Sequence, residues 1–262
     1  MDADSALAEG AEIRIMSFNL LCELWNDKPP IEGRDTRAMA IFTYYAPDVV
    51  GIQEVSDKWY SALDNCFGGL YAFTDRKTER NATNFSTLIY NTEKVKLLDH
   101  GTQVFSKGND PRLRLVTYGV FEKLDSGKRF IVVTTHWDLG SNPQYQQVHS
   151  DEMADICLSL GKKYNLPVIT TGDYNSKESS SYITNFLAKT GYIDSKYTAA
   201  EVKHDCKTYP DLGVHVSTAK AECIDHIFAS PDVEFLFYNV EVSDVATDTS
   251  DHNPIYADLR LK

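Results

Sequence analysis

Polar side chains of one chemical kind follow the apolar runs of this sequence, at the points where strands are expected to end. They are carboxylates, amides and imidazoles, and the residues are Asn19, Glu54, His136, Asp138, Asp173, Asn175, Asp225, His226, Asp251 and His252. Carboxylate and amide oxygens are the ligands that Mg²⁺ or Mn²⁺ prefers, a base can activate water, and neutral or cationic donors stabilise charge on a phosphoryl group. The set indicates phosphoryl-transfer chemistry.

Each of these residues has a simpler explanation when it is taken alone. Asn19 could be a turn residue, and Glu54 could cap a helix that starts near Ser56. The Gly-Asp pair that ends at Asp173 is a common turn, and Asp138 could line a cleft or only cap a loop. Six such endings in one chain favour a shared site over six unrelated turns.

The remaining histidines are expected to have structural or surface positions. Successive strand residues face opposite sides, so His226 should face away from its neighbour Asp225 and pack. His100, His149, His204 and His215 have no evident partner in the sequence and are expected to face solvent.

The spacing of apolar residues predicts an α/β fold. Strand-like runs occupy residues 12–18, 48–53, 85–90, 113–121, 129–136, 167–173, 222–229 and 253–261. Helical spacing predicts helices over 34–45, from Pro143 to Tyr164, and in the segment that ends at Gly191. Strands alternate with helices, and the run from 85 to 136 implies antiparallel pairing, so two packed mixed sheets with helices outside them would fit.

Length and composition limit the possible classes. The chain has 262 residues and a formal charge of −12, with 26 Lys and Arg against 38 Asp and Glu. This charge disfavours broad, salt-driven binding of nucleic acid, but a metal-dependent site acting on one phosphate remains compatible with it. Residues 1–11 are expected to be a flexible segment, and residues 12–262 a single domain. No apolar run reaches the roughly 20 residues of a membrane span.

Two further features concern processing and the compartment. The opening MDADSALAEG lacks the features of a signal peptide but could be the stub left after one was removed, and export is favoured over a cytoplasmic location. Cys206 and Cys223 flank a turn-rich segment, and both a disulfide and two thiols remain open for them. No Cys or His spacing suggests a zinc site.

Six short motifs together resemble one known family. MSFNL, IQEV, TTHWD, TGDYN, IDHIF and SDHNPI, in this order over residues 16 to 255, resemble the endonuclease/exonuclease/phosphatase superfamily. That superfamily includes deoxyribonucleases, abasic-site endonucleases, sphingomyelinases and deadenylases. The resemblance implies a four-layer α/β sandwich of two packed mixed β-sheets flanked by helices, with the site where the loops of the two sheets meet.

The resemblance also implies roles for the metal ligands. Glu54 would be the main carboxylate ligand of a Mg²⁺ or Mn²⁺ ion, helped by Asn19 and Asp251. Asn84 stands where many relatives place a glutamate, which puts a second carboxylate at that position in doubt.

The catalytic roles are implied in the same way. Asp173 would orient or deprotonate the attacking water, and Asn175 would hold a phosphate oxygen. His252 and His136 would face each other across the scissile phosphate, and Asp225 would fix the tautomer of His252. Whether Asp173 or His252 is the base stays open.

Three functions remain after these considerations. A monomeric, metal-dependent phosphoesterase is preferred, acting on a phosphodiester or phosphomonoester of a small molecule, sugar or lipid headgroup. A nuclease acting on DNA or RNA is the first alternative, and a catalytically silent interaction module of the same fold is the second. A serine hydrolase would need a nucleophile elbow of the GxSxG type, and the sequence has none.

Overall fold

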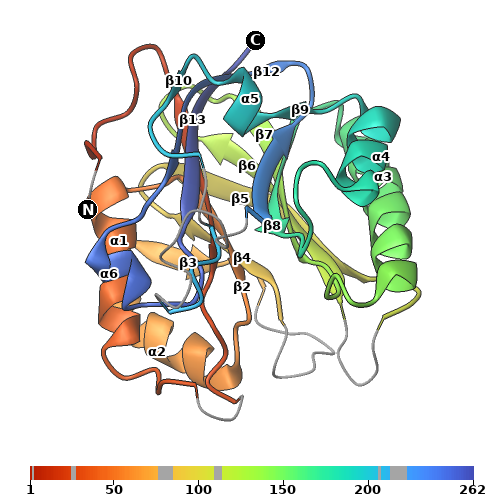
Figure 1. The fold of residues 1–262 in the computed structure, drawn as a ribbon. Coiled ribbons are helices and arrows are strands. Elements are labelled where there is room, and N and C mark those ends of the chain that lie inside the picture. The colour runs from red at the N-terminus through yellow and green to blue at the C-terminus, as the bar shows by residue number, and fades with distance from the viewer. Residues whose placement is uncertain (2, 25–27, 76–84, 109–113, 206–207, 213–222) are drawn as a thin grey trace.

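Two mixed β-sheets pack face to face, and helices cover their outer faces (Figure 1). The computed structural model describes residues 1, 3–24, 28–75, 85–108, 114–205, 208–212 and 223–262. The first sheet has the order β10 (Glu201–Val202), β12 (Val233–Val240), β13 (Ile255–Leu261), β1 (Ile13–Asn19), β2 (Val49–Gln53), β4 (Thr87–Asn91) and β3 (Tyr71–Phe73). The second has the order β5 (Val95–Val104), β6 (Leu115–Lys123), β7 (Arg129–His136), β8 (Val168–Asp173), β11 (Asp225–Ala229) and β9 (Ile193–Asp194).

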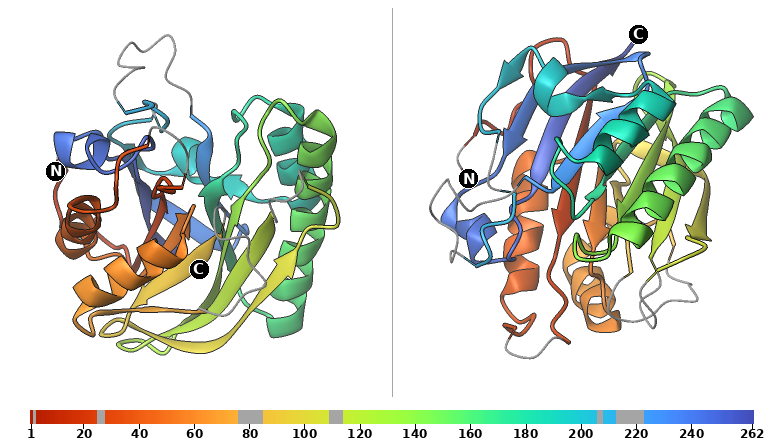
Figure 2. Two further views of the ribbon diagram at one scale, coloured as in Figure 1. Left: turned by 90° about the horizontal axis from the view of Figure 1, so that it is seen from below. Right: turned by 45° about the vertical axis from the view of Figure 1, so that its right-hand side comes forward.

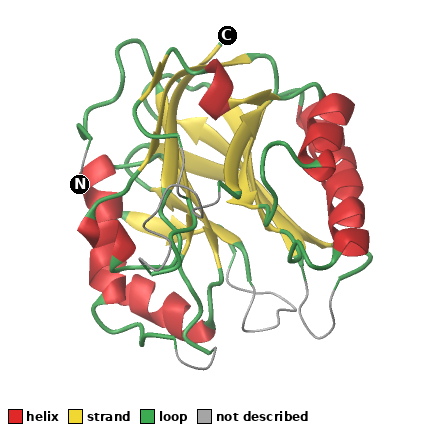
Figure 3. Ribbon diagram, viewed as in Figure 1, coloured by secondary structure: helices red, strands yellow, loops and turns green. Residues whose placement is uncertain are grey.

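The helices lie in two groups on either side of the sheets (Figures 2 and 3). Next to the first sheet are α1 (Arg34–Tyr45), α2 (Asp57–Phe67) and the short α6 (Asp244–Thr247), and next to the second are α3 (Pro143–Tyr164) and α4 (Ser181–Thr190). The short α5 (Ser195–Thr198) follows β9 directly. The four-layer sandwich predicted from the sequence is confirmed.

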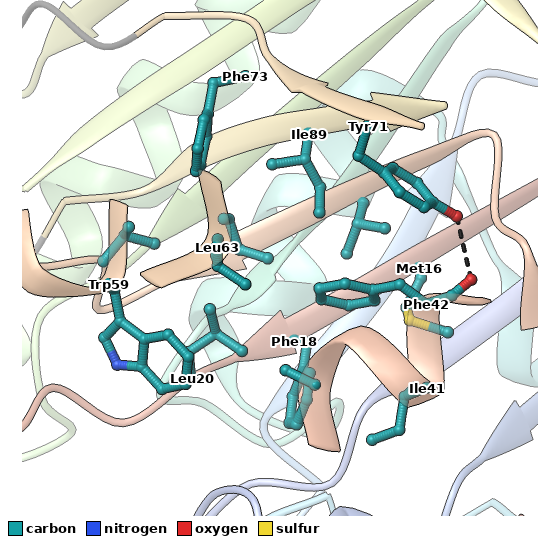
Figure 4. Close-up of a cluster of buried hydrophobic side chains, with 14 of the residues drawn as sticks. Met16, Phe18, Leu20, Ile41, Phe42, Trp59, Leu63, Tyr71, Phe73 and Ile89 are labelled. Atoms are coloured by element: carbon teal, nitrogen blue, oxygen red, sulfur yellow. Dashed lines mark hydrogen bonds between the residues drawn. The ribbon is translucent and has the colours of Figure 1, made fainter. Parts of the chain in front are cut away.

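Strand periodicity divides the buried residues among three apolar clusters. On β1, Met16 and Phe18 face α1 and α2, whereas Ile13 and Ile15 face the second sheet. Figure 4 shows the cluster that contains Met16 and Phe18. In this cluster the Tyr71 hydroxyl also donates a hydrogen bond to the Phe42 carbonyl at 3.0 Å. Each sheet therefore has both faces covered, which explains why several of its strands are apolar throughout.

The two sheets approach each other closely at Gly51 in β2. A Cβ at this position would lie 2.0 Å from the Thr171 Oγ1 and 2.6 Å from the Thr134 Oγ1. Only glycine allows this approach, which brings the end of β2 toward the ends of β7 and β8.

The N-terminal residues contact a buried ion pair. Arg14 Nε donates to Asp258 Oδ1 at 2.6 Å, and the Arg14 guanidinium also donates to the carbonyls of Ser5 and Ala6. The predicted flexibility of residues 1–11 stays a prediction, but these contacts give the segment a defined docking site. In the described part of the chain, no helix is both long and apolar enough for a membrane span.

Candidate active site

The pairing register brings the predicted site residues to one edge of the two sheets. Asn19 ends β1 beside the end of β2, and His136 at the end of β7 pairs with Asp173 at the end of β8. Asp225, the first residue of β11, pairs with Asp173 from the other side. A pocket of about 370 Å³ opens at this edge, and six of the eight predicted residues line it: Glu54, His136, Asp173, Asn175, Asp251 and His252.

Asp173 lies at the centre of the hydrogen bonds in the pocket. Its Oδ2 is 3.1 Å from His136 Nε2, 3.1 Å from Asn19 Nδ2 and 3.6 Å from His252 Nε2. Its Oδ1 accepts the backbone N–H of Asn175 at 2.9 Å. Burial alone would raise the pKa of Asp173, but the two imidazoles beside it, His136 and His252, outweigh burial and hold its pKa well below the usual range. Asp173 is therefore an ionised, rigidly oriented acceptor.

His252 is held by a carboxylate on each side of its ring. Its Nδ1 donates to Asp225 Oδ2 at 2.9 Å, and its Nε2 faces Asp173. Burial opposes the charged imidazole, yet the negative charges of Asp225 and Asp173 raise the pKa of His252 to about 10. Asp225 thus lies behind the imidazole, as the resemblance implies, and fixes its orientation.

His136 has the opposite electrostatic environment. Its pKa is lowered because it is buried and because the Arg114 guanidinium is nearby, and these effects exceed the attraction of Asp173. A neutral His136 donates from Nε2 to Asp173, whereas His252 is cationic beside the same carboxylate. The two imidazoles are thus chemically different at neutral pH.

Glu54 and Asp251 provide the hard oxygen donors that a divalent ion needs. Glu54 Oε2 accepts the Cys22 N–H at 2.8 Å, and Asn19 Nδ2 lies 3.4 Å from Glu54 Oε1. The pKa of Asp251 is raised by burial and then by the charge of Glu54, so a cation between them would relieve their repulsion. This donor set fits Mg²⁺ or Mn²⁺. In the structure the Asn19 Oδ1 accepts from Leu21, so the role of Asn19 as a ligand stays a prediction.

Backbone strain accompanies two of the site residues. Glu54 has φ +58° and Asn175 has φ +48°, both in the left-handed region that non-glycine residues rarely adopt. Such strain persists where surrounding contacts fix it, and it often marks functional sites. Glu54 does not cap the next helix, since the Ser56 Oγ accepts the Trp59 N–H in that role.

A second cluster in the same pocket could also hold a metal ion. Asp173, Asp225 and His252 bring one ligand atom each to within 4.8 Å of one another. Both nitrogens of His252 face carboxylates, however, whereas a metal ligand must offer an unprotonated nitrogen. The geometry therefore favours a hydrogen-bonded triad at these three residues.

A comparison with known families identifies the family of this chain. The model described as Endonuclease/Exonuclease/phosphatase family matches residues 16–252, which include all eight predicted site residues. The chain belongs to the endonuclease/exonuclease/phosphatase family. The resemblance drawn from the six motifs is confirmed.

Individual relatives of this family member are distant. Protein angel of Drosophila melanogaster is 28% identical over 160 residues, which cover 57% of this chain and 45% of that protein. The chain thus spans less than half the length of this curated relative. An endonuclease/exonuclease/phosphatase from Bacteroides vulgatus has a TM-score of 0.83 at 24% identity, covering 95% of this chain and 99% of that one.

Two further solved structures have the same fold. The mannosyl-6-phosphatase of Bacteroides thetaiotaomicron VPI-5482 has a TM-score of 0.82 at 20% identity, covering 95% of this chain and 100% of that one. TDP2 of D. rerio, in complex with a single-strand DNA product, has a TM-score of 0.74 at 19% identity, covering 95% of this chain and 98% of that one. Neighbours of this family thus include both a phosphatase and a protein crystallised with nucleic acid.

Three pocket residues of this family member were not identified from the sequence. Arg114 lines the pocket and is 3% exposed. Lys28 Nζ lies 3.3 Å from Asp251 Oδ2, and the Tyr209 ring lies 4.8 Å from that of His252. Arg114 ends a short basic stretch of the sequence, PRLR at 111–114, whereas nothing in the sequence marks Lys28 or Tyr209.

Other predictions for single residues have mixed outcomes. His226 packs as predicted, since it is buried, stacks on Phe228 and contacts the Ser176 carbonyl through Nε2 at 2.8 Å. Asp138 caps its loop, accepting from Leu139 N and Asn142 Nδ2, both at 2.9 Å. Cys206, Asn84 and His215 lie outside the described residues, so the disulfide and the missing glutamate stay open.

The prediction that His149 faces solvent is wrong. The imidazole is fully buried, its Nδ1 accepts the Asp138 N–H at 3.1 Å, and its Nε2 donates to the Lys107 carbonyl at 2.9 Å. The Phe105 ring stacks on it at 4.3 Å. These two hydrogen bonds use both nitrogens of the neutral ring, and burial together with the Arg114 charge lowers its pKa to about 4.

This pKa predicts a loss of stability in mild acid. In the unfolded chain His149 binds a proton below its ordinary pKa of about 6.5, whereas in the folded chain it binds one only near pH 4. Protons therefore favour the unfolded state, and the free energy of unfolding falls as the pH falls through this range. Between pH 7.5 and pH 5 this should cost about 2 kcal/mol of unfolding free energy. In His149→Gln, urea titration should show that this part of the pH dependence is gone.

The exposed His100 offers a matched control for this test. His100→Gln should keep the pH dependence of the wild type. Identical pH dependence in His149→Gln and the wild type would contradict the buried, neutral imidazole.

Proposed function

We propose that the protein is a divalent-metal-dependent phosphoesterase that hydrolyses a small-molecule phosphomonoester by attack of water. The observation that supports this best is the convergence of donors on one oxygen of Asp173. His136, Asn19 and His252 all lie within 3.6 Å of it, and Glu54 and Asp251 face the same pocket. An ionised carboxylate between two imidazoles, beside two more carboxylates, suits a charged phosphate and a metal ion.

Four residues of the chain have separate roles in the proposed reaction. Asp173 orients the attacking water as an ionised hydrogen-bond acceptor, because its carboxylate is held in place through both oxygens. His252, backed by Asp225, places an N–H donor beside the same position and stabilises the negative charge of the transition state. Asn175 donates one amide hydrogen to the Trp137 carbonyl at 3.0 Å, which leaves the other for a phosphate oxygen.

The metal ion would have a further role in the proposed reaction. Glu54 and Asp251, helped by Asn19, would hold it in the pocket that they line together with Asn175. When bound, a divalent cation supplies charge that offsets the phosphate and lowers the pKa of bound water.

Arg114 favours a monoester over a diester. It is a buried cation on the wall of the pocket, and its charge is close enough to lower the pKa of His136. A phosphomonoester has one more ionisable oxygen than a diester, and a guanidinium can bind two phosphate oxygens together. Lys28 adds a second cation at the side of Asp251.

The size and charge of the molecule favour a small substrate. A pocket of about 370 Å³ accommodates a phosphorylated sugar or nucleotide, and a net charge of −12 repels a polyanion at long range. The mannosyl-6-phosphatase among the structural neighbours makes sugar phosphates a natural first choice. Nuclease activity is the second candidate, because a neighbour was crystallised with single-strand DNA.

A substrate panel tests the proposal. p-Nitrophenyl phosphate, bis-p-nitrophenyl phosphate, mannose 6-phosphate and a single-stranded oligonucleotide would each be incubated with Mg²⁺, Mn²⁺ or EDTA. We expect metal-dependent turnover of the monoesters. A folded protein that hydrolyses nothing in the presence of either metal would instead support a silent interaction module.

Arg114→Gln tests the choice of ester in the same assay. It should lower kcat/KM for the monoester at least about tenfold more than for the diester, because the guanidinium pairs with the additional charge. Arg129→Gln is the control, since Arg129 is an exposed residue that pairs with Glu122. Equal losses for both esters would contradict the monoester assignment.

A further inference from the structure

Asn175 occupies a backbone conformation that must be held by its neighbours. Its φ of +48° is left-handed, and three groups fix it. Its N–H donates to Asp173, its side-chain amide donates to the Trp137 carbonyl, and its own carbonyl accepts from Gln146 Nε2 at 2.9 Å. The first two partners belong to strand ends of the site, but Gln146 comes from a helix outside the second sheet.

Gln146 lies in the first turn of α3 and uses its whole side-chain amide. It is 1% exposed, and its Nε2 donates to the Asp138 carbonyl at 2.8 Å as well as to Asn175. Its Oε1 accepts from Ser176 Oγ at 2.8 Å. One buried amide therefore joins the loop after β7 to the loop after β8.

These two loops are also in direct contact, and both line the pocket. A Cβ at Gly140 would lie 3.5 Å from the Asn175 carbonyl oxygen, and both Gly140 and Asn175 border the pocket. One turn further along α3, His149 accepts the Asp138 N–H. The backbone of Asp138 is thus held at its N–H by His149 and at its carbonyl by Gln146.

We infer that Gln146 is a positioning residue for catalysis: it holds Asn175 and the 137–140 loop as one unit on the phosphate side of the pocket. The inference rests on the proposed function for its effect on rate. It does not involve the metal side, because Gln146 contacts neither Glu54 nor Asp251 through any of its three hydrogen bonds.

Gln146→Met tests this inference, because methionine has a similar length but neither donates nor accepts an amide hydrogen bond. With p-nitrophenyl phosphate as substrate, kcat should fall about 10- to 100-fold, since misplacement of a contact group by about 1 Å has effects of this size. KM and the affinity for Mn²⁺, measured by calorimetry, should stay within about threefold. A residue with a merely structural role would not lower kcat while leaving KM and the affinity for Mn²⁺ nearly unchanged.

Hydrogen exchange provides a readout that does not depend on activity. Peptides covering residues 137–142 and 173–178 should both exchange faster in Gln146→Met, while β1 and β2 exchange as in the wild type. Gln147→Met is the matched control, because Gln147 is the adjacent glutamine and its Nε2 donates to the surface carboxylate of Asp151 at 3.0 Å. Its kcat and exchange should equal those of the wild type.

The possible outcomes separate the two proposals. Unchanged exchange in both loops, or faster exchange with an unchanged kcat, would overturn the role of Gln146. A wild type without phosphoesterase activity would overturn the proposed function, while faster exchange of both loops together would still support the coupling. If Gln146→Met does not fold, Ser176→Ala, which removes only the Oγ bond, should show a smaller change in the same direction, and no change would count against the inference.

Discussion

Replacing Asp173 by asparagine should lower kcat by at least about 10³-fold while the protein stays folded. The Asp173 Oδ2 accepts hydrogen bonds from His136 Nε2 and Asn19 Nδ2, each at 3.1 Å, and His252 Nε2 lies 3.6 Å away. An asparagine at this position would have no negative charge and would either direct its own N–H at these donors or offer a weaker acceptor. The group that orients water and pairs with the His252 cation would be lost.

The measurement is kcat with p-nitrophenyl phosphate, accompanied by a thermal unfolding curve. Asp194→Asn is the matched control, because Asp194 is also a buried carboxylate, but it caps α5 by accepting the Lys196 N–H and is not among the residues that line the pocket. Asparagine is also a good cap, so this variant should keep kcat within about twofold. An Asp173→Asn enzyme that retains a tenth or more of kcat would refute the assigned role.

Replacing Glu54 by glutamine should remove metal binding. We expect the dissociation constant for Mn²⁺ to rise at least about 100-fold, since one of the two carboxylates at the metal position loses its charge. Glutamine can still accept the Cys22 N–H, which Glu54 Oε2 accepts at 2.8 Å, so the loop should keep its conformation. The charge of Glu54 raises the pKa of Asp251, so its removal should leave the free energy of unfolding unchanged or slightly higher.

Calorimetry with Mn²⁺ measures this effect directly. Glu23→Gln is the control, because Glu23 is a nearby carboxylate that instead accepts from Ser56 Oγ at 2.7 Å and lies outside the pocket. Its dissociation constant should equal that of the wild type. Wild-type affinity for Mn²⁺ in Glu54→Gln would show that the metal binds elsewhere, and the Asp173, Asp225 and His252 cluster would then be the candidate.

Local patterns were sufficient to predict most of the fold. Helical spacing predicted 34–45 and Pro143–Tyr164, and both helices have these bounds. The helix expected to end at Gly191 does so, with glycine in the left-handed conformation after Thr190. These features depend on neighbours a few residues apart along the chain, and such neighbours are visible in the sequence.

The strands that were not predicted have weaker local patterns. β5 is a sheet-edge strand whose residues are mostly exposed, so it lacks a buried face to impose alternation. β12 pairs with both β13 and the two-residue β10, and its register shifts between Phe235 and Phe237, which interrupts a regular period.

The site was predicted to the extent that it consists of strand ends. Residues at strand ends are brought together by the pairing register, and the ordered motifs marked them. Arg114, Lys28, Gln146 and His149 reach the site or its supporting loops through tertiary contacts, and no short-range pattern distinguishes such residues from surface or core positions.

The most direct test of the account follows solvent oxygen in a single turnover. Excess protein would be mixed with p-nitrophenyl phosphate in H₂¹⁸O, with Mg²⁺ or with EDTA, and the released phosphate analysed by mass spectrometry. With Mg²⁺, each released phosphate should contain one solvent oxygen, and EDTA or Asp173→Asn should suppress release. Equal release with EDTA, or phosphate without solvent oxygen, would contradict a metal-dependent attack of water on phosphorus.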